Sequence, residues 1–119
     1  MKNTIKLKKN YEFNNTFKKG KYFSGKLIQC FYTKSKKEIN YFGIAISSKL
    51  CNAVERNRIK RVIREVYRNL EKSINTGNVF VFLWNKKVEI EKCNYNDVFE
   101  DMKKIFKDIG AYKDEKNND

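Results

Sequence analysis

The spacing of hydrophobic residues predicts three helices. Residues 10–19 carry two phenylalanines one helical turn apart and are followed by a glycine, which is typical of a short helix. The longest helix is predicted over residues 52–70, where Asn52 and Glu55 form a capping-box pattern. A last helix is predicted over residues 94–109, with an apolar stripe that we expect to pack into the core. The stripe consists of Tyr95, Val98, Phe99, Met102, Ile105, Phe106 and Ile109.

Three further segments predict strands. Residues 26–34 are apolar on both alternating faces, and residues 41–47 form a nearly continuous apolar run. Residues 79–84 form a similar run, which is entered through a Thr-Gly-Asn turn. The order helix, strand, strand, helix, strand, helix predicts an α+β fold with one layer of sheet and helices packed on it.

Length and composition limit the class of protein. The chain has 119 residues, 40% of them hydrophobic, which suits one folded domain rather than a disordered basic tail. It has no histidine, which excludes Ser-His-Asp and Cys-His nucleophiles and imidazole zinc sites. No apolar run approaches the ~18 residues of a membrane span, and the N-terminus lacks a secretory signal. We expect one domain over residues 1–112, a frayed polar tail over residues 113–119, and no membrane partner.

The cysteines indicate a reducing compartment. Cys30, Cys51 and Cys93 are odd in number and match neither a disulfide framework nor a metal-ligand spacing. We therefore expect three small, buried or half-buried thiols and a cytoplasmic protein.

Positive charge is concentrated in the first two thirds of the chain. Residues 1–37 hold eleven lysines and one acid, a net charge of +10, whereas residues 38–84 carry +4 and residues 85–119 carry −1. A field this one-sided suits a polyanionic partner, with nucleic acid first and an anionic membrane surface second.

The predicted long helix has a ladder of cations beside its apolar stripe. At 100° per residue the apolar members gather on one side; they are Ile59, Val62, Ile63, Val66 and Leu70. Arg56, Lys60, Arg64 and Arg68 follow one another at i+4 beside that stripe, near Asn57 and Arg61. Like charges at this spacing repel by ~0.2–0.5 kcal/mol per pair, a cost that a phosphate-bearing partner would relieve. Arg58 lies apart, where we expect a pair with Glu65.

Aromatic side chains could extend such an interface. Phe13 and Phe17 share one face of the first predicted helix, and Phe31 lies within a strand. Single-stranded nucleic acid is held by a cationic groove with aromatic platforms, although phenylalanines in a small domain also serve as core. The residues alone thus predict an RNA- or DNA-binding α+β domain with a cleft between the sheet and the basic helix.

Residues 52–65 closely resemble the protein subunit of bacterial ribonuclease P. The family's signature is Asn-Ala-Val-x-Arg-Asn-Arg-x-Lys-Arg followed by x-x-Arg, and this stretch reproduces it throughout. Leu7-Lys8-Lys9 with the later Phe13, Phe17 and Gly20 resembles the family's opening. Residues 43–49 resemble its central strand, and residues 112–113 its end. The resemblance leaves only the loop at residues 34–40 and the acidic tail unaligned.

The resemblance implies a fold and a function. The implied fold is a single ribosomal protein S5 domain 2-like domain: one mixed sheet, three helices in the order α-β-β-β-α-β-α, and a left-handed βαβ crossover. The implied function is that of the ribonuclease P protein subunit, which binds a catalytic RNA and the 5′ leader of precursor tRNA and promotes removal of that leader. Catalysis and Mg²⁺ would then belong mainly to the RNA subunit. No catalytic residue, protein-held metal or small-molecule substrate is expected in this chain.

The resemblance also assigns site residues. RNA-facing positions on the signature helix are Arg56, Asn57, Arg58, Lys60, Arg61 and Arg64, to which the charge ladder adds Arg68. The leader-binding cleft would be lined by Phe13, Phe17, Phe31 and Lys49. Lys8 and Lys9 would contact phosphates more loosely. Three residues depart from the family pattern, Ser48, Cys51 and Glu55, and they bear on local geometry rather than on the signature cations. Lys86 and Lys87, next to the last strand, are interpreted as solvated turn residues.

Two other classes of function are weaker. A generic basic RNA-binding module, such as a ribosomal-type protein, would share the charge but play no part in cleavage. A helix-turn-helix reading conflicts with the strand predicted at residues 41–47. A stand-alone nuclease would need a cluster of carboxylates for metal or a general base, and the acids of the basic two thirds are too scattered along the sequence for this.

Overall fold

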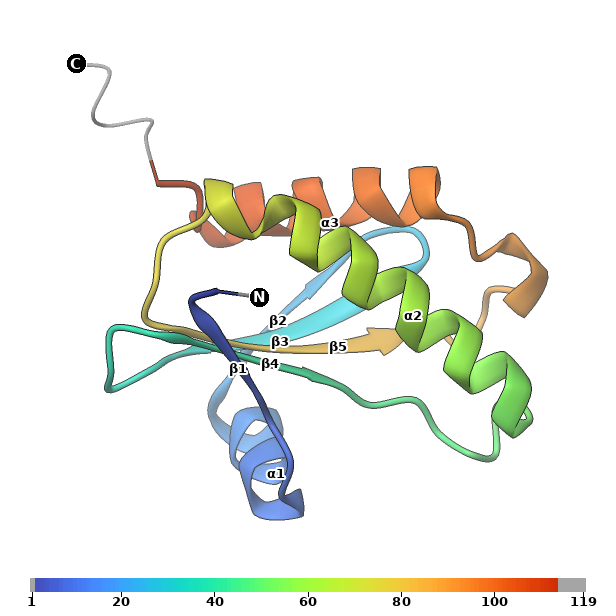
Figure 1. Cartoon of the computed structure of the whole chain (residues 1–119). Helices are drawn as coiled ribbons and strands as arrows, with labels where there is room; N and C mark the ends of the chain where they lie inside the picture. Colours follow the sequence, from blue (N-terminus) through green and yellow to red (C-terminus); the bar gives the residue numbers. More distant parts are fainter. Residues whose placement is uncertain (1, 114–119) are drawn as a thin grey trace.

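The computed structural model describes residues 2–113 and shows one sheet with helices on both faces (Figure 1). The helices are α1 (Asn10–Lys19), α2 (Ala53–Leu70) and α3 (Tyr95–Ile109), with short 3₁₀ turns η1 (Glu71–Ser73) and η2 (Ile90–Lys92). The strands are β1 (Thr4–Lys6), β2 (Lys21–Ser24), β3 (Ile28–Lys34), β4 (Asn40–Ile44) and β5 (Asn78–Trp84). Of the tail expected over residues 113–119, residues 114–119 lie outside the described part of the chain.

The sheet is mixed and has the order β1-β4-β5-β3-β2. β4 pairs in parallel with both β1 and β5, whereas β3 is antiparallel to β5 and β2. In Figure 1, β4 and β5 run from left to right, β5 lies behind β4, and α2 returns above them, so the β4–α2–β5 connection is left-handed. This connection departs from the right-handed crossover found in nearly all such units, as the family resemblance predicted.

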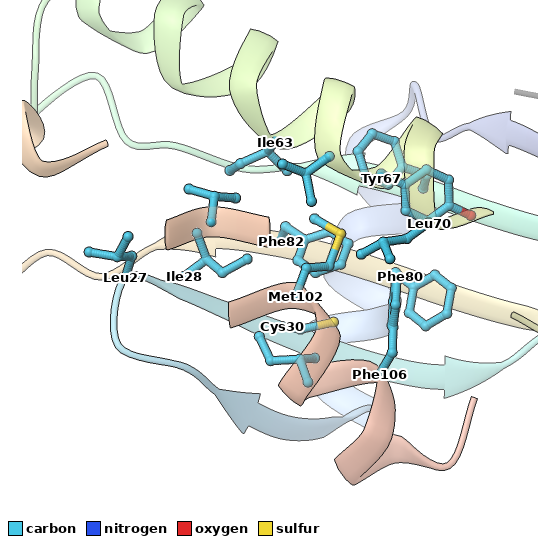
Figure 2. Packing of buried hydrophobic residues seen from close by; sticks show 14 of the residues in the cluster. Leu27, Ile28, Cys30, Ile63, Tyr67, Leu70, Phe80, Phe82, Met102 and Phe106 are labelled. Atoms are coloured by element: carbon cyan, nitrogen blue, oxygen red, sulfur yellow. The ribbon is translucent and has the colours of Figure 1, made fainter. Parts of the chain in front are cut away.

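One face of the sheet is closed by α2 and α3, which lie above it in Figure 1. Phe80, Phe82 and Trp84 of β5 point to this face and are buried, together with Ile28 and Cys30 of β3. Figure 2 shows Ile28, Cys30, Phe80 and Phe82 packed with residues from both helices, among them Ile63, Tyr67, Met102 and Phe106. The apolar stripe predicted for α3 is confirmed, because its members are buried or pack against this core.

The capping signals act as the sequence predicts. The Asn52 side chain accepts a hydrogen bond from the Glu55 N–H at 2.8 Å, and the Glu55 carboxylate accepts one from the Asn52 N–H at 3.0 Å, which completes the capping box of α2. Asn94 caps α3 by accepting from the Asp97 N–H at 2.9 Å. Gly110 follows α3 with a φ of 83°, a left-handed conformation that favours glycine.

Among the described residues, α1 is the one helix on the opposite face of the sheet, where it crosses the middle of the strands. Phe31, Val81 and Gly43 are aligned in neighbouring strands and form the row beneath it. A Cβ atom at Gly43 would lie 2.6 Å from Cε1 of Phe13, so glycine is what lets the Phe13 ring approach the sheet. We call this side the open face, and the side covered by α2 and α3 the closed face.

Candidate nucleic-acid interface

A hollow of about 700 Å³ lies on the open face, at the end of the sheet where β3 begins and β5 ends. Its floor includes Gln29 of β3, Leu83 of β5 and Ala45, which follows β4. Tyr22 of the edge strand β2 lines one side, and three lysines, Lys49, Lys86 and Lys87, line the hollow as well. We call this hollow the first groove.

Two of the three predicted cleft phenylalanines stand beside the first groove. The rings of Phe17 and Phe31 are 5.2 Å apart edge to face, and Tyr22 lies 5.3 Å from Phe31 on the other side. Phe17 and Phe31 are half-buried, and Tyr22 is 52% exposed. An aromatic cluster therefore adjoins a lysine-lined hollow, which is the combination that binds single-stranded nucleic acid.

Phe13 lies apart from this cluster, beside the cations of α2. It lines a smaller hollow of about 150 Å³ together with Lys60 and Arg64. Gly43 and Ile44 of β4 border the same hollow, and Ala45 and Ile46, which come next in the chain, border the first groove. β4 and its continuation therefore lead from the α2 cations to the first groove.

Between α2 and the sheet, the described residues leave only the small hollow that Phe13 lines with Lys60 and Arg64. The space between α2 and the sheet holds fully buried core, including Ile59, Ile63 and Tyr67. The predicted aromatic residues Phe13 and Phe17 come from α1 and lie on the other face. The strands are apolar on both sides, so their sequence pattern could not tell which face was closed.

The cations of α2 are only partly available. Lys60 and Arg64 are half-buried, and Asn57 and Arg61 are exposed. Within residues 2–113, none of these four side chains makes an ion pair or a hydrogen bond to the protein. Their repulsion is therefore not relieved inside the described part of the molecule.

The remaining arginines have partners within the fold. The Arg58 guanidinium donates to the Cys93 carbonyl at 2.7 Å and to the Ile90 carbonyl at 3.5 Å. The expected Arg58–Glu65 pair is therefore wrong: Glu65 pairs with Arg68 at 3.3 Å, and Arg58 reaches the turn before α3. Arg56 donates to the Cys51 carbonyl at 3.1 Å, which holds the entry to α2.

The N-terminal basic segment is tied to α1. The backbone N–H groups of Lys8 and Lys9 both donate to the Glu12 carboxylate at 3.0 Å, while their own side chains remain exposed. These backbone hydrogen bonds, with a smaller contribution from the Lys9 charge, lower the pKa of Glu12 below its ordinary value. Glu12 therefore stays ionised and bound to the backbone, and within residues 2–113 neither ammonium group forms an ion pair.

The sequence interpretation missed several groove residues. Tyr22 was not considered because the residue pattern did not locate β2; only the order implied by the family resemblance has a third strand between the first two helices. Lys86 and Lys87 were interpreted as turn residues, yet they line the first groove with Lys49. Their position directly after an apolar strand could have indicated this, because strand ends bring such residues to one edge of the sheet.

The cysteines and acids show no sign of chemistry of their own. Cys30 and Cys93 are buried and Cys51 is half-buried, and all three are free thiols, as predicted. Burial raises the pKa of the Cys30 and Cys93 thiols, which keeps them protonated. Within residues 2–113, no three cysteine or acidic side chains come together as metal ligands. No helix of that region is long and apolar enough to cross a membrane.

Comparisons of sequence give a consistent family. The Ribonuclease P family model matches residues 1–110. The chain is 33% identical over 108 residues to the ribonuclease P protein component of Clostridium botulinum, covering 90% of this chain and 96% of that one. It is 34% identical over 115 residues to the corresponding protein of Clostridium acetobutylicum, covering 94% and 95%.

Comparisons of structure agree on the fold. The Staphylococcus aureus RNase P protein superposes with a TM-score of 0.78 at 24% identity, covering 91% of this chain and 97% of that one. The Thermotoga maritima RNase P protein also gives 0.78, at 26% identity, covering 87% and 96%. The α+β fold with one mixed sheet and three helices is therefore confirmed.

Proposed function

Because this chain belongs to the family of bacterial ribonuclease P protein components, we propose that it binds the catalytic RNA through α2 and the 5′ leader of precursor tRNA in the first groove. The chain is the protein component of the ribonuclease P holoenzyme, which processes the 5′ ends of tRNA, and it partners with the RNA of that holoenzyme. We assign both binding roles to residues 1–112.

The leader-binding role is carried by one observation: an aromatic cluster adjoins a hollow lined by three lysines on an open sheet face. Tyr22, Phe31 and Phe17 offer rings for base stacking, which does not depend on base identity. Lys49, Lys86 and Lys87 offer point charges for the phosphates of a backbone that lies across the floor. Such a site tolerates any sequence, which suits leaders that differ from one precursor tRNA to the next.

The RNA-subunit role rests on the cations of α2 that lack an internal partner. Lys60, Arg61 and Arg64 share one side of the helix with Asn57, and binding of RNA phosphates there would relieve their repulsion. Arg56 and Arg58 would contribute while also donating to backbone carbonyls, and Arg68 would act from its pair with Glu65. Lys8 and Lys9 add exposed charge beside α1.

The chemistry of leader removal is assigned to the RNA subunit. An RNA-based holoenzyme of this family needs metal ions, and we propose that they are Mg²⁺ ions held mainly by the RNA. Within residues 2–113 no three acidic or cysteine side chains lie together as metal ligands. The protein residues named above would bind and orient RNA and would not take part in bond breaking. Three free thiols support a cytoplasmic setting.

The test is cleavage of a precursor tRNA by a bacterial ribonuclease P RNA at low Mg²⁺, with and without this protein. We expect rapid cleavage only when the protein is added, and a benefit that is larger for a substrate with a leader than for one almost without. If the protein binds both RNAs but leaves cleavage unchanged, it is a generic RNA-binding module. Cleavage by the protein alone would contradict the assignment of catalysis to the RNA.

A further inference from the structure

α1 divides the open face into two hollows, only one of which is the first groove. The second lies at the other end of the sheet, where β3 ends and β4 and β5 begin, and has a volume of about 830 Å³. Its floor includes Thr33, Tyr41 and Val79, which are aligned in neighbouring strands. We call it the second groove. It includes part of the loop at residues 34–40, which the family resemblance left unaligned.

The second groove is strongly cationic. Five lysines line it, from the end of α1, the end of β3 and the β3–β4 loop: Lys18, Lys19, Lys34, Lys36 and Lys37. None of them forms an ion pair within residues 2–113. The one acid that lines the groove, Glu12, accepts hydrogen bonds from the backbone of residues 8 and 9. Glu38 is exposed in the same loop and offsets one of the five charges.

The groove also has aromatic and amide groups suited to RNA. Tyr11 is 67% exposed at one wall, and Tyr41 is half-buried at the floor. Asn14 and Asn15 line the groove from α1 with exposed side chains that can donate to or accept from bases. Exposed rings beside unpaired cations are the combination that holds single strands.

We propose that the second groove binds the 5′-distal part of a long leader, as single-stranded RNA. This rests on the proposed leader site in the first groove. Gln29 lies in the floor of the first groove and Thr33 in the floor of the second. These two residues are four positions apart on β3, about 13 Å at 3.3 Å per residue, so the two grooves are close together on one face. A leader that leaves the first groove can therefore pass α1 and reach the second. The α2 cations, which approach the β1–β4 edge, are left for the RNA subunit.

The experiment compares two substrates in the holoenzyme: precursor tRNA with a leader that fills only the first groove, and the same tRNA with a longer leader. The variant is Lys36→Gln with Lys37→Gln, and the matched control is Lys72→Gln with Lys107→Gln, which removes the same charge from exposed positions elsewhere. For the variant we expect weaker binding of the long leader only, and a fall of about 1.4 in the log–log slope of its affinity against salt. Tyr11→Ala should also weaken the long leader, by at least about fivefold, if the ring stacks on a base.

Three results would overturn the proposal. Equal losses of affinity for the short-leader and long-leader substrates would show that the groove contacts the RNA subunit or attracts RNA only through its general positive charge. Equal losses of affinity for the long leader in the variant and its control would show that only the general positive charge matters. No loss with either leader would show that the lysines are simply solvated. Failure of the proposed function is distinguishable, because the unmodified protein would then not promote cleavage of the short-leader substrate.

Discussion

The two faces of the sheet are built from the same strands, but the closed face is buried in the core and the open face is partly exposed. On β5, Phe80 and Phe82 point to the closed face and are fully buried, whereas Val79 and Leu83 point to the open face and are only half-buried. The closed face is filled by two long helices, the open face by one short helix that leaves a hollow on either side. Alternate residues of β5 thus fill the core on the closed face, whereas on the open face Val81 is buried under α1 and only Val79 and Leu83 line the hollows.

Truncating two neighbouring residues of β5, one on each face, tests most directly whether the closed face contributes more to stability than the open face. Phe82→Ala removes a ring that packs against Phe42, Phe80 and Phe106, and it should lower the free energy of unfolding by ~3–5 kcal/mol. Leu83→Ala, on the open face, should cost clearly less. Urea unfolding of both variants measures the difference, and equal losses would show that the open face also carries the fold.

The next effect belongs to leader binding. Phe17→Ala removes the ring that meets Phe31 and should weaken leader binding by ~1–3 kcal/mol if these rings stack on bases. Phe23→Ala is the matched control, because Phe23 is half-buried but packs toward the closed face. Affinity for precursor tRNA with and without a leader is the measurement. A folded Phe17 variant with unchanged dependence on the leader would assign that ring to packing alone.

Two arginines of the signature should respond differently. Arg64→Ala should reduce the log–log slope of RNA affinity against salt by about one, because Arg64 has no internal partner in the described region. Arg58→Ala should instead lower the free energy of unfolding by about 1 kcal/mol, since its guanidinium donates to the Cys93 carbonyl. Salt titrations and urea unfolding of both variants separate the roles, and an unchanged slope would remove Arg64 from the phosphate contacts.

The smallest effect concerns the edge strand β1, whose contribution to stability should be present at neutral pH and lost in acid. The Glu71 carboxylate accepts hydrogen bonds from the Thr4 hydroxyl at 2.6 Å and from the Asn3 and Lys2 N–H groups. Burial raises the pKa of Glu71, but these hydrogen bonds outweigh it and hold the pKa below 4.5. Because the folded pKa is lowered, this stabilisation is present above pH 4.5 and is lost as the pH falls through the folded value.

Glu71→Gln tests that sign. The variant should be less stable than the parent near neutral pH and should lose less stability between pH 5 and about pH 3. Thermal unfolding across this range is the measurement. Parallel curves for parent and variant would show that the carboxylate does not fasten β1.

The helices were readable from local signals, and the edge strands were not. α1, α2 and α3 lie where the predicted segments placed them, because their caps and apolar spacing are contained within each helix. β1 has three residues, two of them exposed, and β2 has one half-buried residue, so neither shows the apolar run of a central strand. Their pairing partners lie elsewhere in the chain, and only tertiary structure reveals them.

The sequence could predict which residues of α2 belong to the site, but not where the grooves lie on the sheet. The spacing on α2 correctly placed Lys60, Arg61 and Arg64 beside the buried stripe, since that depends on helical geometry alone. Arg58 took a partner 35 residues away, which no local spacing could indicate. The grooves depend on which side of the sheet α1 covers, and that choice is made by long-range packing.

The way α1 is held has a consequence for motion. Of its ten residues only Thr16 is fully buried, and its contacts with the sheet include the Phe17 ring against Phe31 and the Phe13 ring beside Gly43. A helix this short gains little stability from its own hydrogen bonds, and local opening is easiest where few apolar contacts are buried. Among the three helices, α1 is therefore the one whose amide protons exchange first while the core stays intact, and RNA bound on either side of it would slow that exchange.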